Sequence, residues 1–408
     1  MQRRAAPGAA ATLDAVVRRL LTPIVAVLVV LALLVGVFLG GHPGLLPSFA
    51  RNALVSDSDG RVYEEAVDKI AADYYRKIDR KKLLNDSLTA AVASLKDRFS
   101  HYIDPSQYHA FEESTNGEFE GVGLNVEQIP AGLRVVTVFD GGPARKAGLR
   151  KGDEVVGVGG KSLKGVKSDR STDLIKGPAG TSVRLTILRG GRRFDKTVQR
   201  DSVSVPVSQE RIATRNGTKY GYVSLAQFTS GAHGAVGANV RKALKAGAKG
   251  IVLDLRDNGG GLLQEGVLVA SVFLRDGTVV TTRGRARAEK TYAASGDAIA
   301  ANVPVVVLVN RGTASASEIV TGALQDRARA TVVGTRTFGK GVFQEIEGLT
   351  NGGALDITVG QYFTPKGRNL GPHAGKPGGI TPDVRVTDDP KTARDEALDR
   401  ALAVLAGK

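Results

Sequence analysis

A serine at a strand-to-helix turn is the first residue of this chain that points to chemistry. Ser315 follows the apolar run Val305–Val309, which predicts a buried strand, and precedes residues 318–326, whose apolar side chains recur at helical spacing. At such a turn a hydroxyl projects into a cleft, while free backbone N–H groups and the positive end of the helix face developing negative charge. Acyl transfer needs both, so Ser315 is a candidate nucleophile.

Lys340 is a candidate general base for this serine. It follows residues 330–334, a second predicted strand, and its sequence neighbours Gly339 and Gly341 supply no carboxylate. A lysine acts as a base only when burial or a nearby cation lowers its pKa. If residues 340–344 are extended, Lys340 and Gln344 lie on one face, because strand side chains alternate. Gln344 would then orient the amine without raising its pKa as a carboxylate does.

A structural role for the same serine stays open at this point. Ser315 and Glu318 have the spacing of a capping box, in which a serine hydroxyl closes the N-terminus of a helix. Ser317 is a second candidate cap residue. Such motifs are common at helix starts, so the serine motif alone does not establish catalysis.

Lys340 also has an alternative interpretation, as part of a phosphate-binding loop. Gly334, Gly339 and Lys340 have the spacing of that motif and follow a predicted strand. Position 341, however, is glycine where a magnesium-binding Ser or Thr is required, and residues 342–346 alternate like a strand instead of opening a helix. A nucleotide-dependent enzyme is therefore the weaker hypothesis.

Taken together, these residues resemble the carboxyl-terminal processing serine peptidases, also called tail-specific proteases. The resemblance rests on Ser-Ala-Ser-Glu at 315–318, Phe-Gly-Lys-Gly at 338–341 and the glutamine that follows. It implies that Ser315 is the nucleophile, that Lys340 is the general base and that Gln344 assists the lysine. It implies no metal and no other cofactor.

The run Leu-Asp-Leu-Arg-Asp-Asn-Gly-Gly-Gly at 253–261 is similar to the glycine-rich turn of that family. The resemblance implies an oxyanion hole built from the Ala316 amide and one amide among Gly259, Gly260 and Gly261. Glycine suits this role, because a backbone without Cβ approaches a substrate carbonyl closely and adopts unusual dihedral angles. A tight turn without a catalytic role is the alternative for this run.

Residues 117–203 resemble a PDZ domain, a module that binds peptide C-termini. Short β-rich segments alternate with glycine turns, and the loop at 121–124 is expected to cradle a terminal carboxylate while the ligand adds a strand to the sheet edge. The residues expected to bind the peptide are Gly121, Val122, Gly123, Leu124, Val126, Leu174 and Ile175. An ordinary glycine turn is the alternative.

The N-terminal region has the features of a membrane anchor. Residues 20–39 are uncharged and apolar, and as a helix they would span about 30 Å, the hydrocarbon thickness of a bilayer. Arg18 and Arg19 precede them, so the N-terminus is expected in the cytoplasm and the catalytic part outside it, in the periplasm or the extracellular space. Cleavage of the segment after the small residues Gly40 and Gly41 stays open.

The chain has no cysteine, which excludes disulfides and thiolate chemistry.

The expected architecture is a multidomain α/β protein whose core resembles the crotonase/ClpP-like α/β fold. Helical spacing over 61–113 predicts a small helical unit, in which His101 and His109 are assigned to surface or packing roles and not to a metal site. The expected order is a cytoplasmic N-terminus (1–17), a transmembrane signal-anchor (18–41), a linker (42–59), a helical segment (60–116), the PDZ domain (117–203), the serine peptidase core (204–388) and a C-terminal helix (389–408).

The net charge of +15 has a local source, since residues 140–200 contain fifteen Lys or Arg against six Asp or Glu. No zinc or RNA-binding pattern accompanies this charge, so no nucleic-acid partner is expected. The charge is expected to attract carboxylate-bearing tails or anionic envelope surfaces, with a solvated basic face as the alternative.

A non-catalytic PDZ scaffold of the envelope is the rival function. The sequence leaves open whether the chain forms a homo-oligomer or needs an activating adaptor protein.

Overall fold

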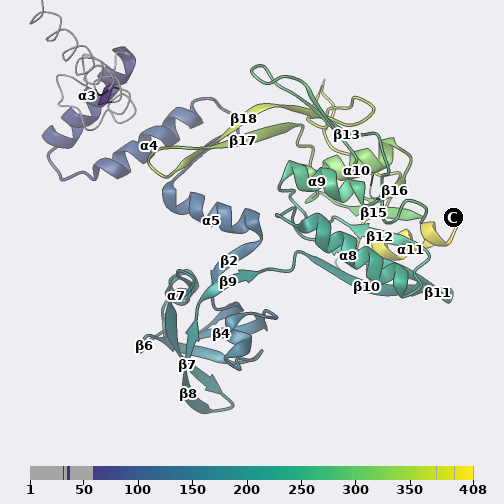
Figure 1. Ribbon diagram of the computed structural model, residues 1–408, viewed down its shortest axis with the longest axis horizontal. Helices are drawn as coiled ribbons and strands as arrows, with labels where there is room; N and C mark the ends of the chain where they lie inside the picture. The colour runs from purple at the N-terminus through teal and green to yellow at the C-terminus, as the bar shows by residue number, and fades with distance from the viewer. Residues whose placement is uncertain are drawn as a thin grey trace, which may run out of the picture. The chain divides into compact units, whose positions relative to one another are not determined.

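The computed structural model describes residues 31, 35–36, 58–296, 298–373, 375–389 and 391–407. The expected segments 1–17, 18–41 and 42–59 lie almost wholly outside these residues. In the described part of the chain, no helix is both long enough and apolar enough to span a bilayer. The chain divides into two compact units, residues 1–90 and residues 91–408 (Figure 1).

The first unit contains helix α3 (Ser58–Asp73) and most of α4 (Arg80–Ala93). Ion pairs at helical spacing stabilise both helices, including Lys82 with Asp86 at 2.7 Å. Arg80 also pairs with Asp68 of α3, which fastens the two helices together.

The segment that follows α4 contains a strand that helical spacing did not predict. Strand β1 (His101–Ile103) pairs antiparallel with β18 (Ala354–Phe363), and Tyr102 and Ile103 are buried. Helix α5 (Pro105–Asn116) starts immediately afterwards, because the Asp104 carboxylate accepts the first free N–H groups and proline is tolerated at the first helical position. Three residues at 101–103 therefore interrupt the expected helical segment 60–116.

The PDZ region forms a six-stranded antiparallel sheet in the order β3-β4-β5-β7-β8, with β6 paired to β5. Alternation drives its packing: in β7, Val183, Leu185 and Ile187 are buried while the residues between them face outward. Strand β3 has a partner on one side only and is an edge of the sheet. The elements are β3 (Leu124–Ile129), β4 (Gly132–Val138), α6 (Pro143–Lys146), β5 (Glu154–Val158), β6 (Lys161–Ser162), α7 (Ser168–Ile175), β7 (Ser182–Arg189) and β8 (Arg192–Gln199).

A two-stranded antiparallel ladder precedes and follows this sheet in the chain. It pairs β2 (Glu118–Gly121) with β9 (Asp201–Ser204). Gly117 between α5 and β2 has φ 70°, a conformation that ends the helix and that glycine adopts without strain.

The core domain is built on a second six-stranded sheet in the order β10-β11-β12-β15-β16-β19, parallel except for the β10–β11 hairpin. Its central strand β15 is apolar and buried throughout because helices cover both faces of the sheet. Val305 and Val307 of β15 pack toward α8, α9 and α10, whereas Val306 and Leu308 pack toward α11. The elements are β10 (Ser208–Arg215), β11 (Thr218–Leu225), α8 (Ala232–Lys245), β12 (Ile251–Asp254), α9 (Leu263–Ser271), β15 (Val305–Val309), α10 (Ala316–Asp326), β16 (Ala330–Gly334), β19 (Val384–Arg385) and α11 (Glu396–Ala406).

A five-stranded sheet includes β17, the strand that begins two residues after Lys340. Strand β18 is its centre and pairs with β1, β13 and β17. The other strands are β13 (Thr278–Arg283), β14 (Lys290–Ala293) and β17 (Val342–Gly348). The mixed α/β class expected from the sequence is confirmed, with a PDZ sheet and a separate α/β core.

Candidate active site

Ser315 occupies the sharp turn between β15 and α10. Its φ of 57° and ψ of −119° lie in a region that non-glycine residues rarely adopt, and its carbonyl accepts the N–H groups of Glu318 and Ile319 at 2.8 and 3.0 Å. Such strained dihedral angles persist only where the surroundings enforce them, and they concentrate at functional sites. Ser315 is the N-cap residue of α10, whereas Ser317 lies inside the helix and donates its hydroxyl to the Asn258 carbonyl at 2.9 Å.

The glycine-rich turn packs directly against the serine. A Cβ on Gly260, whose φ is 104°, would lie 2.7 Å from the Ser315 Cβ, so only glycine fits there. The Gly260 N–H donates to the Asn258 side chain at 2.9 Å. That bond uses the Gly260 amide, whereas Gly259 and Gly261 both line the pocket described below. Of the three glycines on this turn, Gly259 and Gly261 are thus the two that line the pocket.

Glu318 connects the serine turn to the lysine loop. Its carboxylate is fully buried: Oε1 accepts the Thr337 hydroxyl at 2.6 Å and the Gly339 N–H at 2.8 Å, and Oε2 accepts the Ser315 and Lys340 N–H groups at 3.0 Å each. Burial raises the pKa of Glu318, and these hydrogen bonds oppose that rise. Sequence reasoning identified Glu318 only as half of a capping box. Its bond to the Ser315 N–H belongs to that capping box. Its other three bonds, to Thr337, Gly339 and Lys340, hold the lysine loop in place.

Lys340 is half-buried, and burial lowers its pKa, as a general base requires. Three carboxylates oppose this effect: those of Asp356, Asp97 and Glu318. Its ammonium group lies 5.1 Å from the centre of the Phe99 ring. The sequence neighbours of Lys340 supply no carboxylate, but chain folding brings these acidic groups close to it.

Gln344 lines the pocket described below. Its side-chain amide bonds to a threonine, whereas the sequence predicted an interaction with the Lys340 amine. Its Nε2 donates to the Thr358 hydroxyl at 2.9 Å. Strand β17 starts at Val342, and its pairing with β18 shifts register between Phe343 and Gln344. The extra residue at this irregularity is Val359 of β18, so β17 keeps its own alternation. Lys340 precedes the first residue of β17, so the regular strand face that carries Gln344 does not extend to it.

One pocket of about 520 Å³ brings the candidate catalytic residues together. Apolar side chains from several elements form most of its wall, and two residues of α5 also reach it. Sequence reasoning did not identify the contributions of Phe111, Tyr292 or Asp356, since they come from distant parts of the chain. The lining residues are Phe111, Thr115, Gln227, Phe228, Gly259, Gly261, Leu262, Leu263, Tyr292, Ser315, Ala316, Ile319, Lys340, Phe343, Gln344, Glu345, Ile346, Asp356 and Tyr362.

The residues expected to bind a peptide in the PDZ domain are placed in two groups. Val122 and Ile175 are buried in the hydrophobic core of the domain, so their side chains stabilise the sheet. Leu124 and Val126 lie on the edge strand β3 and are half-buried, and Leu174 is 42% exposed. Gly121 ends β2, and Gly123, with φ 80°, starts the turn into β3. The residues that remain accessible therefore lie along β3 and on α7.

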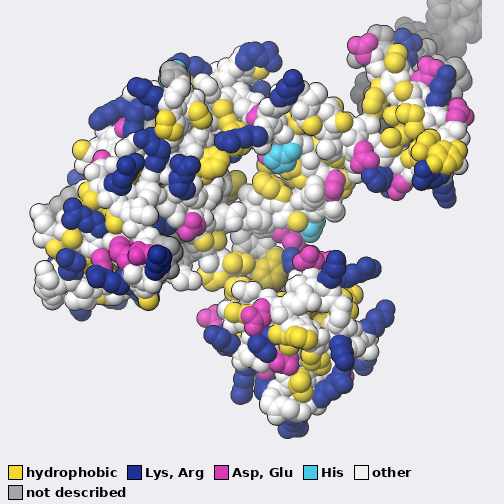
Figure 2. Space-filling view, turned by 180° about the vertical axis from the view of Figure 1, so that it is seen from behind, with side chains coloured by type: hydrophobic (Ala, Val, Ile, Leu, Met, Phe, Trp, Pro, Cys, Tyr) yellow, Lys and Arg dark blue, Asp and Glu magenta, His cyan; other side chains and the backbone are white. Residues whose placement is uncertain are grey.

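The basic side chains of the PDZ domain are spread over its surface. On the face drawn in Figure 2, Lys and Arg are interspersed with Asp and Glu. Some are paired within the domain, as Arg189 is with the buried Asp153 at 2.5 Å. This distribution matches a solvated basic face at least as well as one concentrated binding patch.

The two histidines of the expected helical segment 60–116, His101 and His109, lie close to carboxylates. His101 Nε2 lies 3.4 Å from an oxygen of Asp356, and His109 Nδ1 lies 3.9 Å from an oxygen of Glu113. Both imidazoles are more than half exposed. His109 is therefore a surface residue, whereas His101 contacts a residue of the pocket wall.

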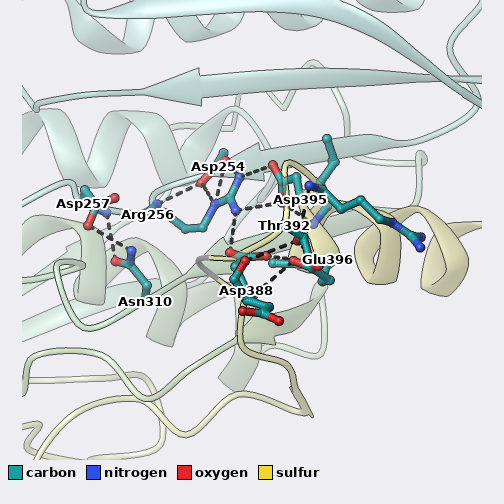
Figure 3. Close-up of polar contacts among 12 residues, drawn as sticks. Asp254, Arg256, Asp257, Asn310, Asp388, Thr392, Asp395 and Glu396 are labelled. Atoms are coloured by element: carbon teal, nitrogen blue, oxygen red, sulfur yellow. Dashed lines mark hydrogen bonds and ion pairs between the residues drawn. The ribbon is translucent and has the colours of Figure 1, made fainter.

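A charged network fastens the glycine-rich turn to the C-terminal helix (Figure 3). Arg256 donates to Asp254 at 2.6 Å and makes two bonds of 2.8 Å to Asp395, the N-cap residue of α11. Burial alone would lower the pKa of Arg256, but its hydrogen bonds to these carboxylates raise it. Because Asp395 is held in this network, α11 starts at Glu396 and not at the expected residue 389.

Comparison with known proteins places the chain in a family. Residues 219–386 match peptidase family S41, and residues 134–189 match the PDZ domain. The chain is 36% identical over 348 residues to the carboxy-terminal-processing protease of Bartonella bacilliformis, covering 83% of this chain and 77% of that protein.

Two further similarities describe the extent of the match. A Staphylococcus aureus protein named "Probable CtpA-like serine protease" is 36% identical over 322 residues, which cover 78% of this chain and 63% of that relative. The chain thus matches less than two thirds of the length of that relative. A solved structure of a putative S41 protease from Bacteroides fragilis has the same fold, with a TM-score of 0.50 at 20% identity over 83% of this chain and 92% of that one. The chain belongs to peptidase family S41, the family of the carboxy-terminal-processing proteases, and contains a PDZ domain.

Proposed function

We propose that this protein is a membrane-anchored serine endopeptidase that binds the C-terminal tails of protein substrates through its PDZ domain and cleaves them with Ser315 and Lys340. One observation carries the proposal. One pocket at the N-terminus of helix α10 is lined by Ser315, Lys340, Gln344, Ala316 and, from the glycine-rich turn, Gly259 and Gly261. A nucleophile, a base with a lowered pKa and amide donors in one pocket are the parts that acyl transfer requires.

The chemistry follows from these positions. Neutral Lys340 accepts the hydroxyl proton of Ser315, whose oxygen attacks a peptide carbonyl. The Ala316 N–H and the amide of Gly259 or Gly261 stabilise the oxyanion. The Lys340 ammonium then gives its proton to the leaving amine, and water, deprotonated by the same lysine, hydrolyses the acyl-enzyme. Gln344, which lines the same pocket and is held by its bond to the Thr358 hydroxyl, is assigned to assist Lys340.

Substrate capture is assigned to the free edge of β3. An extended C-terminal tail would add there as a further strand, with its carboxylate at the loop that joins Gly121 to Leu124. Gln128 fixes the far end of this edge: its Nε2 donates to the Val166 carbonyl at 2.8 Å, and its Oε1 accepts the Ser168 N–H at 2.6 Å. These bonds hold the start of α7 beside β3, which supports a preformed groove.

The location of the enzyme follows from its N-terminal sequence. The apolar stretch 20–39 with Arg18 and Arg19 before it would anchor the chain in the cell membrane. The PDZ domain and the peptidase core would then face the extracytoplasmic side, where they meet exported proteins.

The test uses the full-length chain in detergent micelles with an unfolded protein that ends in an apolar C-terminus. Products are identified by mass spectrometry for the wild type, Ser315→Ala and Lys340→Ala, with Ser230→Ala and Lys366→Ala as exposed controls. We expect cleavage by the wild type and by both controls only. Tail binding without cleavage by the wild type would instead favour the non-catalytic scaffold.

A further inference from the structure

The short strand β1 brings a second ionisable pair to the base. In the β1–β18 ladder His101 lies directly opposite Asp356, and their side chains approach to 3.4 Å. Asp356 also lines the pocket that contains Ser315 and Lys340. This carboxylate thus reaches the catalytic pocket from an element that carries no residue of the proposed catalytic set.

Asp356 is a carboxylate with unused hydrogen-bonding capacity. Its side chain is 15% exposed, and Oδ1 is buried with no hydrogen-bond partner among the described residues. Burial raises its pKa, while the charges of His101 and Lys340 lower it. A buried acceptor without a partner is costly, so its retention in a catalytic pocket points to a role there.

The other carboxylates near the base are already occupied. Asp97 accepts the Ser100 hydroxyl at 2.6 Å, and the four bonds to Glu318 are described above. Glu345 lies in the same pocket but pairs with Arg287 at 2.6 Å.

An aromatic ring and a guanidinium also lie close to Lys340. The Phe99 ring lies 5.1 Å from the Lys340 ammonium, and the Arg98 guanidinium lies 4.5 Å from the centre of that same ring. Of the described groups around Lys340, Asp356 is thus the carboxylate that keeps an acceptor free of other bonds.

We propose that Asp356 is a positioning residue for the general base, and that its carboxylate provides the counter-charge that stabilises the Lys340 ammonium formed when Ser315 loses its proton. His101 lies 3.4 Å from one oxygen of this carboxylate, and the other oxygen has no hydrogen-bond partner among the described residues, in a pocket that Asp356 and Lys340 line together. The arrangement makes Lys340 a stronger base at the cost of a higher working pH. This inference rests on the proposed role of Lys340 in peptide cleavage.

The expected effect of Asp356→Asn has two parts with one cause. Loss of a nearby negative charge lowers the pKa of Lys340 by about one unit or more, so the acidic limb of the pH–rate profile moves to lower pH by that amount. At the same time the plateau rate falls, because the lysine is a weaker base and its ammonium form has lost its counter-charge. A purely structural role would lower the rate without moving the pH limb.

The experiment measures the pKa of Lys340 directly and separately from cleavage. The full-length protein in micelles is acetylated with trace acetic anhydride across a pH series, and the modified fraction of Lys340 is determined by peptide mass spectrometry. The variants are Asp356→Asn and Asp356→Ala, which guards against a folding defect of one of them. Glu345→Gln is the matched control, since it removes a pocket carboxylate that is already paired with Arg287.

We expect a lowered Lys340 pKa in both Asp356 variants and no change in Glu345→Gln. An unchanged Lys340 pKa in the Asp356 variants, or an equal shift in Glu345→Gln, would overturn the proposal. If the pKa moves as expected but no protein cleaves the tail substrate, the coupling of Asp356 to Lys340 is upheld and the peptidase function fails instead.

Discussion

The substitution Glu318→Gln removes the charge of this side chain and keeps its shape. It should weaken the connection between the turn at Ser315 and the lysine loop that contains Thr337, Gly339 and Lys340. In the native protein its two oxygens accept three backbone N–H groups and one hydroxyl. The amide of Glu318→Gln has one oxygen, so one pair of these donors would face an NH₂ group that cannot accept them. Each buried donor left unsatisfied costs about 1 to 3 kcal/mol, which gives a loss of roughly 2 to 6 kcal/mol for the pair.

The assay for this variant combines urea unfolding with cleavage of the tail substrate. We expect a lower unfolding midpoint and a strong loss of cleavage, because Ser315 and Lys340 both lose a backbone anchor. Ser315→Ala is the comparison, since it should abolish cleavage with little loss of stability. A Glu318→Gln protein with wild-type stability and wild-type cleavage would refute the role assigned to this carboxylate.

Three further predictions follow from the same geometry. Lys340→Arg should be inactive across the whole pH range in a cleavage assay, because a guanidinium does not deprotonate in proteins, whereas activity of the wild type should rise through the lowered pKa of Lys340. Gly260→Ala should lower kcat by about 100-fold or more through displacement of the nucleophile, and Gly348→Ala, where a Cβ meets nothing within 4 Å, is the control. Arg256 holds the pKa of Asp395 below its ordinary value despite the opposing effect of burial. Its contribution is therefore present above about pH 4 and is lost as pH falls through the depressed pKa, which hydrogen exchange of α11 would detect as local opening.

Local patterns were sufficient to predict the elements on either side of Ser315, the proposed nucleophile. The apolar run Val305–Val309 is a central strand, and the helical spacing after Ser315 is that of α10, although α10 is buried all round from Ala316 to Leu324. The close approach of Gly260 to Ser315 explains why a glycine-rich run accompanies the serine motif.

Long-range pairing could not be predicted in the same way. The three residues of β1 lie more than 250 positions from their partners on β18, and nothing in their local pattern identifies that pairing. As a result the acidic groups around Lys340 were not foreseen. The bond that Gln344 donates to Thr358 depends on the pairing of β17 with β18, and the start of α11 depends on Asp395 being held by Arg256. Both are consequences of tertiary contacts.

The most direct test of the account is to locate the residue that reacts with a fluorophosphonate probe. The full-length protein is labelled in micelles, digested and examined by peptide mass spectrometry, with Lys340→Ala in parallel. The account predicts one adduct, on Ser315, whose formation is lost or strongly slowed in Lys340→Ala. An adduct on a different serine, or equal labelling of Ser315 without the lysine, would contradict the assignment of Ser315 and Lys340 as nucleophile and base.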